Sequence, residues 1–113
     1  MAKFLVVIKS EDSLNVGTGL NVSQALKNLG AEDVKIVFLG PGIRVLTKNN
    51  QLSNLILNAK DNLNKLGVKV FACETAMKNY NISKEDLVYV DEISKGAEII
   101  LEHADRGYTI LTF

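Results

Sequence analysis

Five short segments of the chain are continuously apolar and rich in β-branched or aromatic residues. A strand covered on both faces is apolar throughout, whereas a half-exposed strand alternates, so these segments predict the strands of a parallel sheet. In chain order they are Phe4–Ile8, Ile36–Leu39, Val68–Ala72, Leu87–Val90 and Tyr108–Phe113.

Amphipathic patterns lie between these segments and predict helices, three of which end at a glycine. The three patterns are Val22, Ala25, Leu26 and Leu29 before Gly30, then Leu52, Leu55, Ile56, Ala59, Leu63 and Leu66 before Gly67, then Ala97, Ile100, Leu101 and Ala104 before Gly107. A short further helix is expected from Glu74 to about Asn79. Because strands and helices alternate with short linkers, we expect right-handed crossovers and a three-layer α/β/α sandwich with a mostly parallel five-stranded sheet.

Length and composition restrict the class of protein. A chain of 113 residues fits one domain, residues 1–113, and its 47% hydrophobic and 23% charged residues argue against disorder. The 13 basic and 13 acidic side chains cancel, which removes a general attraction to nucleic acid or to anionic membranes. No apolar stretch approaches the roughly 20 residues of a membrane span. The first apolar run is too short for a secretory signal, so we expect a cytoplasmic protein.

The counts of cysteine and histidine restrict the chemistry. A single cysteine, Cys73, excludes an internal disulfide, and with only one histidine, His103, a dedicated zinc site is not expected. We expect His103 to have a structural or surface role near the end of the last helix. Asp91 and Glu92 could form an acid and base pair, but their place before Ser94 is more typical of capping residues.

Gly17-Thr18-Gly19 follows the first predicted strand, where some folds bind nucleotides. The third glycine of a dinucleotide motif is replaced by Val22, and no phosphate-loop lysine is present. We therefore interpret the segment as a flexible loop before a helix capped by Asn21 or Ser23.

Gly40-Pro41-Gly42 is followed by apolar residues in what should be an exposed connection, namely Ile43, Val45 and Leu46. Two interpretations remain open: the cluster contacts another subunit, or it folds back onto its own core. Arg44 and Lys48 beside it are expected to be solvated charges, with anion binding as the alternative.

Cys73 is the sharpest candidate for chemistry because it stands where a strand ends and a short helix begins. Backbone N–H groups at the start of a helix favour an anion and would stabilise a thiolate. Glu74 opposes this by repulsion, and Lys78 would offset it if the helix turned it toward the sulfur. The alternative is a small, inert, buried residue at a strand end.

Three segments resemble the DsrE/DsrF-like family. Gly67–Ile82 is similar to its cysteine segment, in which a strand ends in a cysteine before a short helix; Phe38–Ile43 is similar to its second strand and glycine loop, and Gly96–Phe113 to its last helix and strand. Two departures are visible: Asn81 stands where many members have glycine, and Ala76 and Met77 replace a second cysteine found in some members.

The resemblance implies a compact α/β/α fold of flavodoxin-like architecture and a homo-oligomer, a trimer or a multiple of trimers. It also implies a sulfur-relay role, in which Cys73 accepts sulfane sulfur as a persulfide from a donor protein and passes it to an acceptor protein, with no metal or organic cofactor. In this hypothesis the turn around Thr75 and Ala76 stabilises the anion.

The competing hypothesis is a non-enzymatic oligomeric module that binds a small ligand at a subunit boundary, near Cys73 and the loop from Gly40 to Leu46, with Cys73 only lining the pocket. Lys78, Gly40 and Gly42 are the further candidate binding residues. A nucleotide-binding role is a third interpretation, which rests on fold analogy alone.

Overall fold

The computed structural model describes residues 1–113 and contains an open sheet of five parallel strands. They are β1 (Lys3–Ile8), β2 (Asp33–Phe38), β3 (Lys69–Cys73), β4 (Glu92–Ser94) and β5 (Thr109–Thr112), in the spatial order β4-β3-β2-β1-β5. The sandwich with a parallel five-stranded sheet is therefore confirmed. Because all strands run the same way, their carboxyl ends share one edge of the molecule, where ligands bind in open sheets of this kind.

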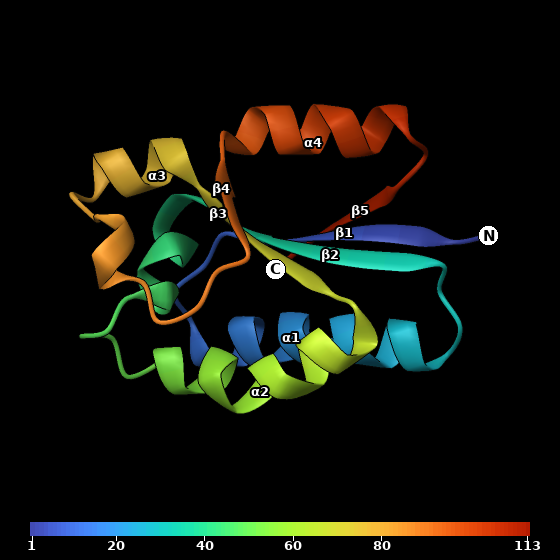
Figure 1. Ribbon diagram of the computed structural model, residues 1–113, viewed down its shortest axis with the longest axis horizontal. Coiled ribbons are helices and arrows are strands. Elements are labelled where there is room, and N and C mark those ends of the chain that lie inside the picture. Colours follow the sequence, from blue (N-terminus) through green and yellow to red (C-terminus); the bar gives the residue numbers. More distant parts are fainter.

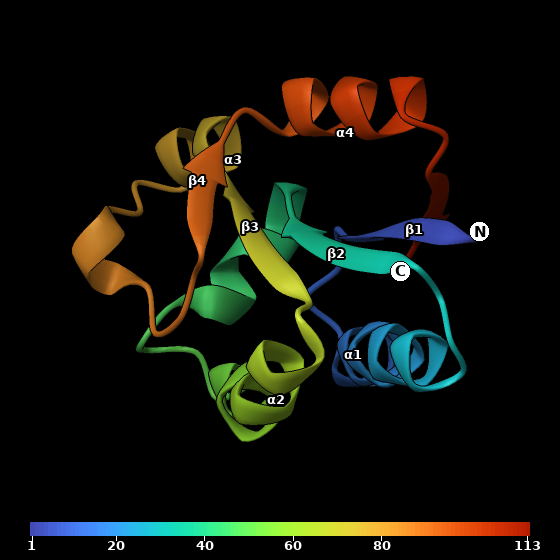
Figure 2. The ribbon, with the colours of Figure 1, turned by 45° about the vertical axis from the view of Figure 1, so that its right-hand side comes forward.

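Helices cover both faces of the sheet. They are α1 (Ser13–Asn28), α2 (Ser53–Leu66), α3 (Glu74–Asn79) and α4 (Gly96–Asp105), with 3-10 turns η1 (Gly40–Leu46) and η2 (Lys84–Asp86). Figures 1 and 2 show α1 and α2 together on one face and α4 on the other, while α3 lies beyond the carboxyl ends of the strands. No helix combines the length and the apolar character needed to cross a membrane.

The two faces of the sheet are packed unequally. The larger core lies between the sheet, α1, α2 and η1, and it includes Val6, Ile36, Phe38, Val70 and Ile56. The smaller core lies under α4 and consists of Leu5, Val7, Val37, Phe71 and Ile99. The ten-residue helix α4 thus covers this face of the sheet by itself, and polar side chains lie against the sheet beside α4.

The first helix begins earlier than the sequence predicted. Asp12 caps it, accepting a hydrogen bond from the backbone N–H of Asn15 at 2.9 Å, so the predicted caps at Asn21 and Ser23 are wrong. The glycines expected in a flexible loop lie inside α1. A Cβ at Gly19 would stand 3.2 Å from the Ile8 side chain, which shows how closely the helix approaches β1. The buried face is Val16, Gly19, Leu20 and Ser23.

The fourth strand is also displaced. Leu87–Val90 was predicted as a strand, but the strand that pairs with β3 is Glu92–Ser94. Leu87 forms only an isolated antiparallel bridge with Thr47, and the backbone N–H of Val88 donates to Leu46. This segment therefore packs on η1 instead of extending the sheet.

The segment after β2 folds back onto its own chain. Ile43, Val45 and Leu46 are fully buried in the larger core, which confirms the second of the two interpretations of this cluster. Gly42 allows the close approach, because a Cβ there would overlap the backbone carbonyl of Ile8. Arg44 forms an ion pair with Glu11 at 2.8 Å and stays partly exposed.

Candidate functional site

Cys73 is the last residue of β3 and the residue directly before α3. Alternation along the strand places Phe71 and Cys73 on the face covered by α4. The strand register sets Cys73 beside Ser94, the last residue of β4. The cysteine therefore stands at the carboxyl edge of the sheet, as the sequence predicted, with its side chain toward the start of α4.

A shallow pocket of about 270 Å³ opens at this edge. Its lining residues are Leu39, Gly40, Cys73, Thr75, Ala76, Asn79, Gly96 and Ala97. The lining is mostly apolar or backbone, and only 6% of Cys73 is exposed. The cysteine thus forms part of the pocket wall and is reached only through the pocket.

The start of α4 lies directly against the sulfur. A Cβ at Gly96 would stand 2.9 Å from Cys73 Sγ, so only a glycine leaves the sulfur its present space. No side chain caps α4, and none caps α3, whose first residue follows Cys73. The first amides of a helix have no partner within the helix and favour a negative charge nearby. Two helix starts therefore meet at one sulfur atom.

The sequence indicated only one of these two helix starts. The α3 start was visible because Cys73 and Glu74 are adjacent in the chain. The contribution of α4 was missed, since Gly96 lies far from Cys73 in sequence and was interpreted only as part of a helix. A glycine at the first position of a helix was the available signal, because it removes a side chain where a close approach is needed.

The charged residues near Cys73 pair with each other. Lys78 Nζ lies 3.4 Å from a carboxylate oxygen of Glu74, one helical turn away, and both side chains are well exposed. Lys78 therefore turns toward Glu74 and not toward the sulfur. The structure brings Thr75, Ala76 and Gly40 to the pocket with Cys73, whereas Lys78 and Gly42 lie outside its lining.

The other candidates have structural positions. Asp91 accepts a hydrogen bond from the backbone N–H of Val70 at 2.8 Å, so it caps a strand of the sheet and not a helix. His103 is only 2% exposed, which excludes the surface role. Its Nδ1 hydrogen-bonds to the carbonyl of Ile99 at 2.6 Å on the same helix. Neither residue lines the pocket at Cys73.

Asn81 occupies a left-handed turn, a conformation that glycine adopts without strain. Its φ of 54° lies in the left-handed region, and it follows the last turn of α3. The N–H groups of Asn81 and Ile82 donate back to Lys78 and Met77, which closes the helix end. Asparagine tolerates the left-handed conformation better than most other residues with a side chain, so Asn81 can form the turn after α3.

Comparison with known proteins places the chain. Its sequence matches the DsrE/DsrF-like family over residues 1–113. No protein of curated function matches it. Among the solved structures that share the fold is MTH1491 from Methanobacterium thermoautotrophicum, a protein of unknown function, with a TM-score of 0.83, 19% identity and both chains covered completely. BT1422 from Bacteroides thetaiotaomicron, also of unknown function, has a TM-score of 0.75 and 16% identity over 98% of this chain and 94% of that one. The YchN protein from E. coli has a TM-score of 0.70 and 17% identity over all of both chains.

Proposed function

The chain belongs to the DsrE/DsrF-like family, and from this membership we propose that it is a cytoplasmic sulfur carrier, or sulfurtransferase subunit, that holds sulfane sulfur as a persulfide on Cys73. The observation that carries the proposal is the position of the single cysteine at the carboxyl edge of the sheet, in a pocket wall where α3 and α4 both begin.

The transfer consists of two displacements at sulfur. The Cys73 thiolate attacks the outer sulfur of a donor persulfide, so a new S–S bond forms on Cys73, the donor S–S bond breaks, and the donor leaves as a thiolate. An acceptor thiolate then attacks the same outer sulfur and releases Cys73. Both steps exchange one S–S bond for another, so neither needs an external oxidant, a metal or an organic cofactor.

The surrounding backbone supports each step through charge. Cys73 attacks as a thiolate in the first displacement and departs as a thiolate in the second, so negative charge develops on its sulfur in both steps. The first-turn amides of α3, at Thr75 and Ala76, and those of α4 offer positive ends of N–H dipoles to this charge. The pocket volume of about 270 Å³ equals that of about nine water molecules, which leaves room for the added sulfur.

Intact-mass measurement after incubation with glutathione persulfide tests the proposal. The native protein is expected to gain about 32 Da, the mass of one sulfur atom. Cys73→Ser is the control, because it removes the single thiol of the chain. A native protein that gains no sulfur while a known persulfide carrier does so in parallel would refute the proposal.

The competing function is a non-enzymatic module that binds a small apolar ligand in the same pocket. The observation that favours it is the low exposure of Cys73 among mainly apolar and backbone lining. In that case Cys73 reacts slowly with a thiol reagent in the native protein and rapidly after unfolding, and a ligand copurifies. Fast native-state reaction without any ligand favours sulfur carriage.

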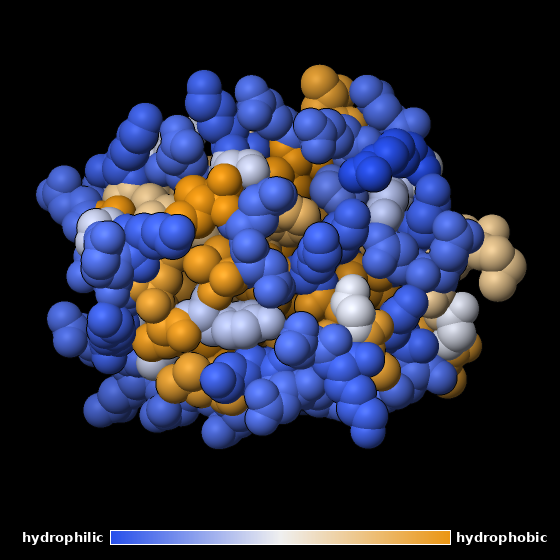
Figure 3. Space-filling view, viewed as in Figure 1, coloured by the Kyte–Doolittle hydropathy of each residue, from blue (hydrophilic) through white to orange (hydrophobic).

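We further propose that the chain forms a homo-oligomer, a trimer or a multiple of trimers, through the edge of the sheet at β4. Leu87, Val88, Val90 and Ile93 are only half-buried there, and Figure 3 shows apolar surface gathered over this side of the molecule. Light scattering coupled to size exclusion tests the state of the native chain. Val90→Lys, checked by circular dichroism for folding, is expected to dissociate it.

A further inference from the structure

The space around the sulfur of Cys73 decides where the outer sulfur of a persulfide lies. Only 6% of Cys73 is exposed, and this part faces the pocket of about 270 Å³. The Cβ position of Gly96 lies 2.9 Å from Sγ, and an S–S bond is about 2.05 Å long. An outer sulfur that pointed at the start of α4 would therefore lie about 0.9 Å from this position. It would overlap the backbone of Gly96, so this direction is closed.

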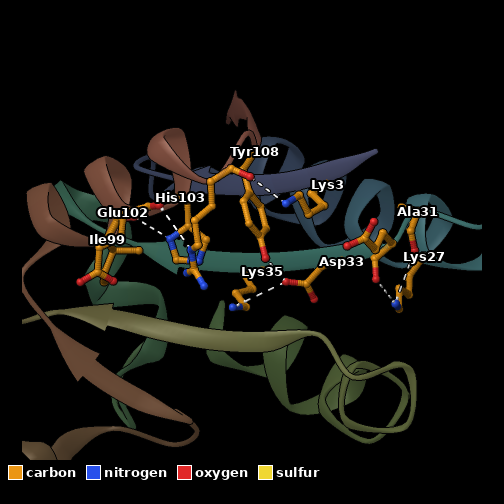
Figure 4. A network of polar contacts seen from close by, with 11 residues as sticks. Lys3, Lys27, Ala31, Asp33, Lys35, Ile99, Glu102, His103 and Tyr108 are labelled. Carbon is orange, nitrogen blue, oxygen red and sulfur yellow. Dashed lines mark hydrogen bonds and ion pairs between the residues drawn. The ribbon is translucent and has the colours of Figure 1, made fainter. Parts of the chain in front are cut away.

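The start of α4 is held in this place, because the other end of the helix is anchored to the sheet. Lys3 Nζ donates to the carbonyl of Arg106, directly after the helix, at 2.7 Å. Tyr108 follows, and its hydroxyl donates to Asp33 on β2 (Figure 4). The ring of His103 on α4 makes an edge contact with the ring of Tyr108, with 4.7 Å between their centroids. The outer sulfur of a persulfide must therefore extend into the pocket.

Two side chains of the pocket lining carry polar atoms besides Cys73, and both belong to α3. They are Thr75 and Asn79. Since they are four residues apart, they lie on one face of the helix, the face toward the pocket. Asn79 stands six residues after Cys73, about 9 Å along the helix axis, which is too far for an atom about 2 Å beyond Sγ. Thr75 stands only two residues after Cys73, so its hydroxyl is the one within reach.

The hydroxyl of Thr75 is free to donate. Thr75 is an exposed residue at the second position of α3, and its Oγ1 forms no hydrogen bond with another group of the chain. The pocket lining contains no charged side chain, and Lys78 beside it pairs with Glu74 at 3.4 Å. No cation therefore competes with the hydroxyl for the outer sulfur.

We propose that the hydroxyl of Thr75 is a further catalytic group, which donates a hydrogen bond to the outer sulfur of the Cys73 persulfide. This role rests on the sulfur-carrier function proposed above, in which backbone amides act on Sγ alone. When an acceptor anion attacks the outer sulfur, the S–S bond breaks, its electron pair stays on Sγ of Cys73, and the hydroxyl keeps its proton. The attack brings negative charge to the outer sulfur, and a hydroxyl that donates to this atom stabilises the charge.

Cyanide tests this role, because it removes the outer sulfur without needing a binding site of its own. Its carbon bonds to the outer sulfur, thiocyanate leaves with that atom, and Cys73 remains as a thiolate. The protein is loaded with glutathione persulfide, and the loss of about 32 Da after addition of cyanide is followed by intact mass. Thr75→Val keeps the shape of the side chain without the hydroxyl, so the loss should slow about tenfold, as removal of one hydrogen bond does. Thr75→Ser retains the hydroxyl and should react at the native rate.

Two controls distinguish this role from a structural one. Thr18→Val makes the same change at an exposed position of α1, outside the pocket, and should leave the cyanide rate unchanged. Iodoacetamide should alkylate unloaded Cys73 equally in all variants, because the hydroxyl acts on the outer sulfur and not on Sγ.

Three results would overturn the role of Thr75. They are a native cyanide rate in Thr75→Val, a Thr75→Ser variant as slow as Thr75→Val, and alkylation of unloaded Cys73 that slows in Thr75→Val as much as the cyanide reaction does. A native chain that gains no sulfur refutes the sulfur carrier, and this role with it, before cyanide is added. The two failures are therefore distinguishable.

Discussion

Adding one methyl group at Gly96 tests the contact between α4 and the sulfur of Cys73. The new Cβ would stand 2.9 Å from Sγ and 3.4 Å from a methyl carbon of Leu39. Favourable van der Waals contacts of a carbon atom begin at about 3.5 Å, so the sulfur of Cys73 or the start of α4 must move by about 0.6 Å. Overpacking of this kind costs about 1–3 kcal/mol, while replacing a helical glycine with alanine gains about 0.5–1 kcal/mol. We therefore expect Gly96→Ala to be destabilised by up to about 2.5 kcal/mol.

The same methyl group covers the sulfur, so the rate at which Cys73 reacts with iodoacetamide should fall. Urea unfolding measures the loss of stability in Gly96→Ala. Intact-mass measurements over time give the rate at which Cys73 is alkylated. Gly17→Ala is the matched control, because Gly17 also lies in a helix but has open space around its Cβ position. It should gain about 0.5–1 kcal/mol and leave the alkylation rate unchanged. If Gly96→Ala were stabilised as much as this control and alkylated at the native rate, the close contact described here would be wrong.

Three further changes probe the fold. Gly42→Ala places a Cβ against the backbone carbonyl of Ile8, which cannot move cheaply, so urea unfolding should show a loss of about 2–3 kcal/mol. Asn81→Val should lower the free energy of unfolding by about 1–2 kcal/mol, because a β-branched residue is strained at a φ of 54°. Asn81→Gly should stay within about 1 kcal/mol of the native chain. Equal stability of the two variants would contradict the left-handed turn. Burial, and then the hydrogen bond to Asp33, raise the pKa of Tyr108 from 10.0 to about 12. The unfolded chain therefore loses the Tyr108 proton at a lower pH than the folded chain does. The free energy of unfolding falls as the pH rises from 10.0 toward about 12. Tyr108→Phe should remove this part of the decline in unfolding experiments at alkaline pH.

The sequence predicted those elements whose local pattern agrees with their place in the fold. The stripe from Leu52 to Leu66 before Gly67 became α2, which ends at Gly67 in the left-handed conformation, and the helix after Cys73 was predicted with its observed bounds. The first helix was predicted to begin too late because Gly17 and Gly19 were interpreted as loop residues. In the structure Gly19 is retained for its close approach to β1, a tertiary reason that a helix pattern does not reveal.

Faces of helices were harder to predict than helices. The pattern on α4 indicated Ala97, Ile100, Leu101 and Ala104 as core positions. Of these, Ile100 packs partly against the smaller core, but the buried face is Gly96, Ile99 and His103, and Leu101 is 62% exposed. Counting apolar residues could not distinguish these faces, since the true one contains a glycine and a histidine. For the same reason the contact between Gly96 and Cys73 was not expected, whereas Cys73 itself was found through its chain neighbours alone.

The order of strands in the sheet has a consequence for how the chain folds. β1 pairs on one side with β2, which follows after a single helix, but on the other side with β5, whose Thr109 lies opposite Phe4 more than a hundred residues later. During synthesis one edge of β1 therefore lacks its neighbour until nearly the whole domain has left the ribosome. An unpaired strand edge is a template for strands of other molecules. Closure of β5 onto β1 is thus expected to be the late and concentration-sensitive stage of refolding, and the stage at which aggregation competes.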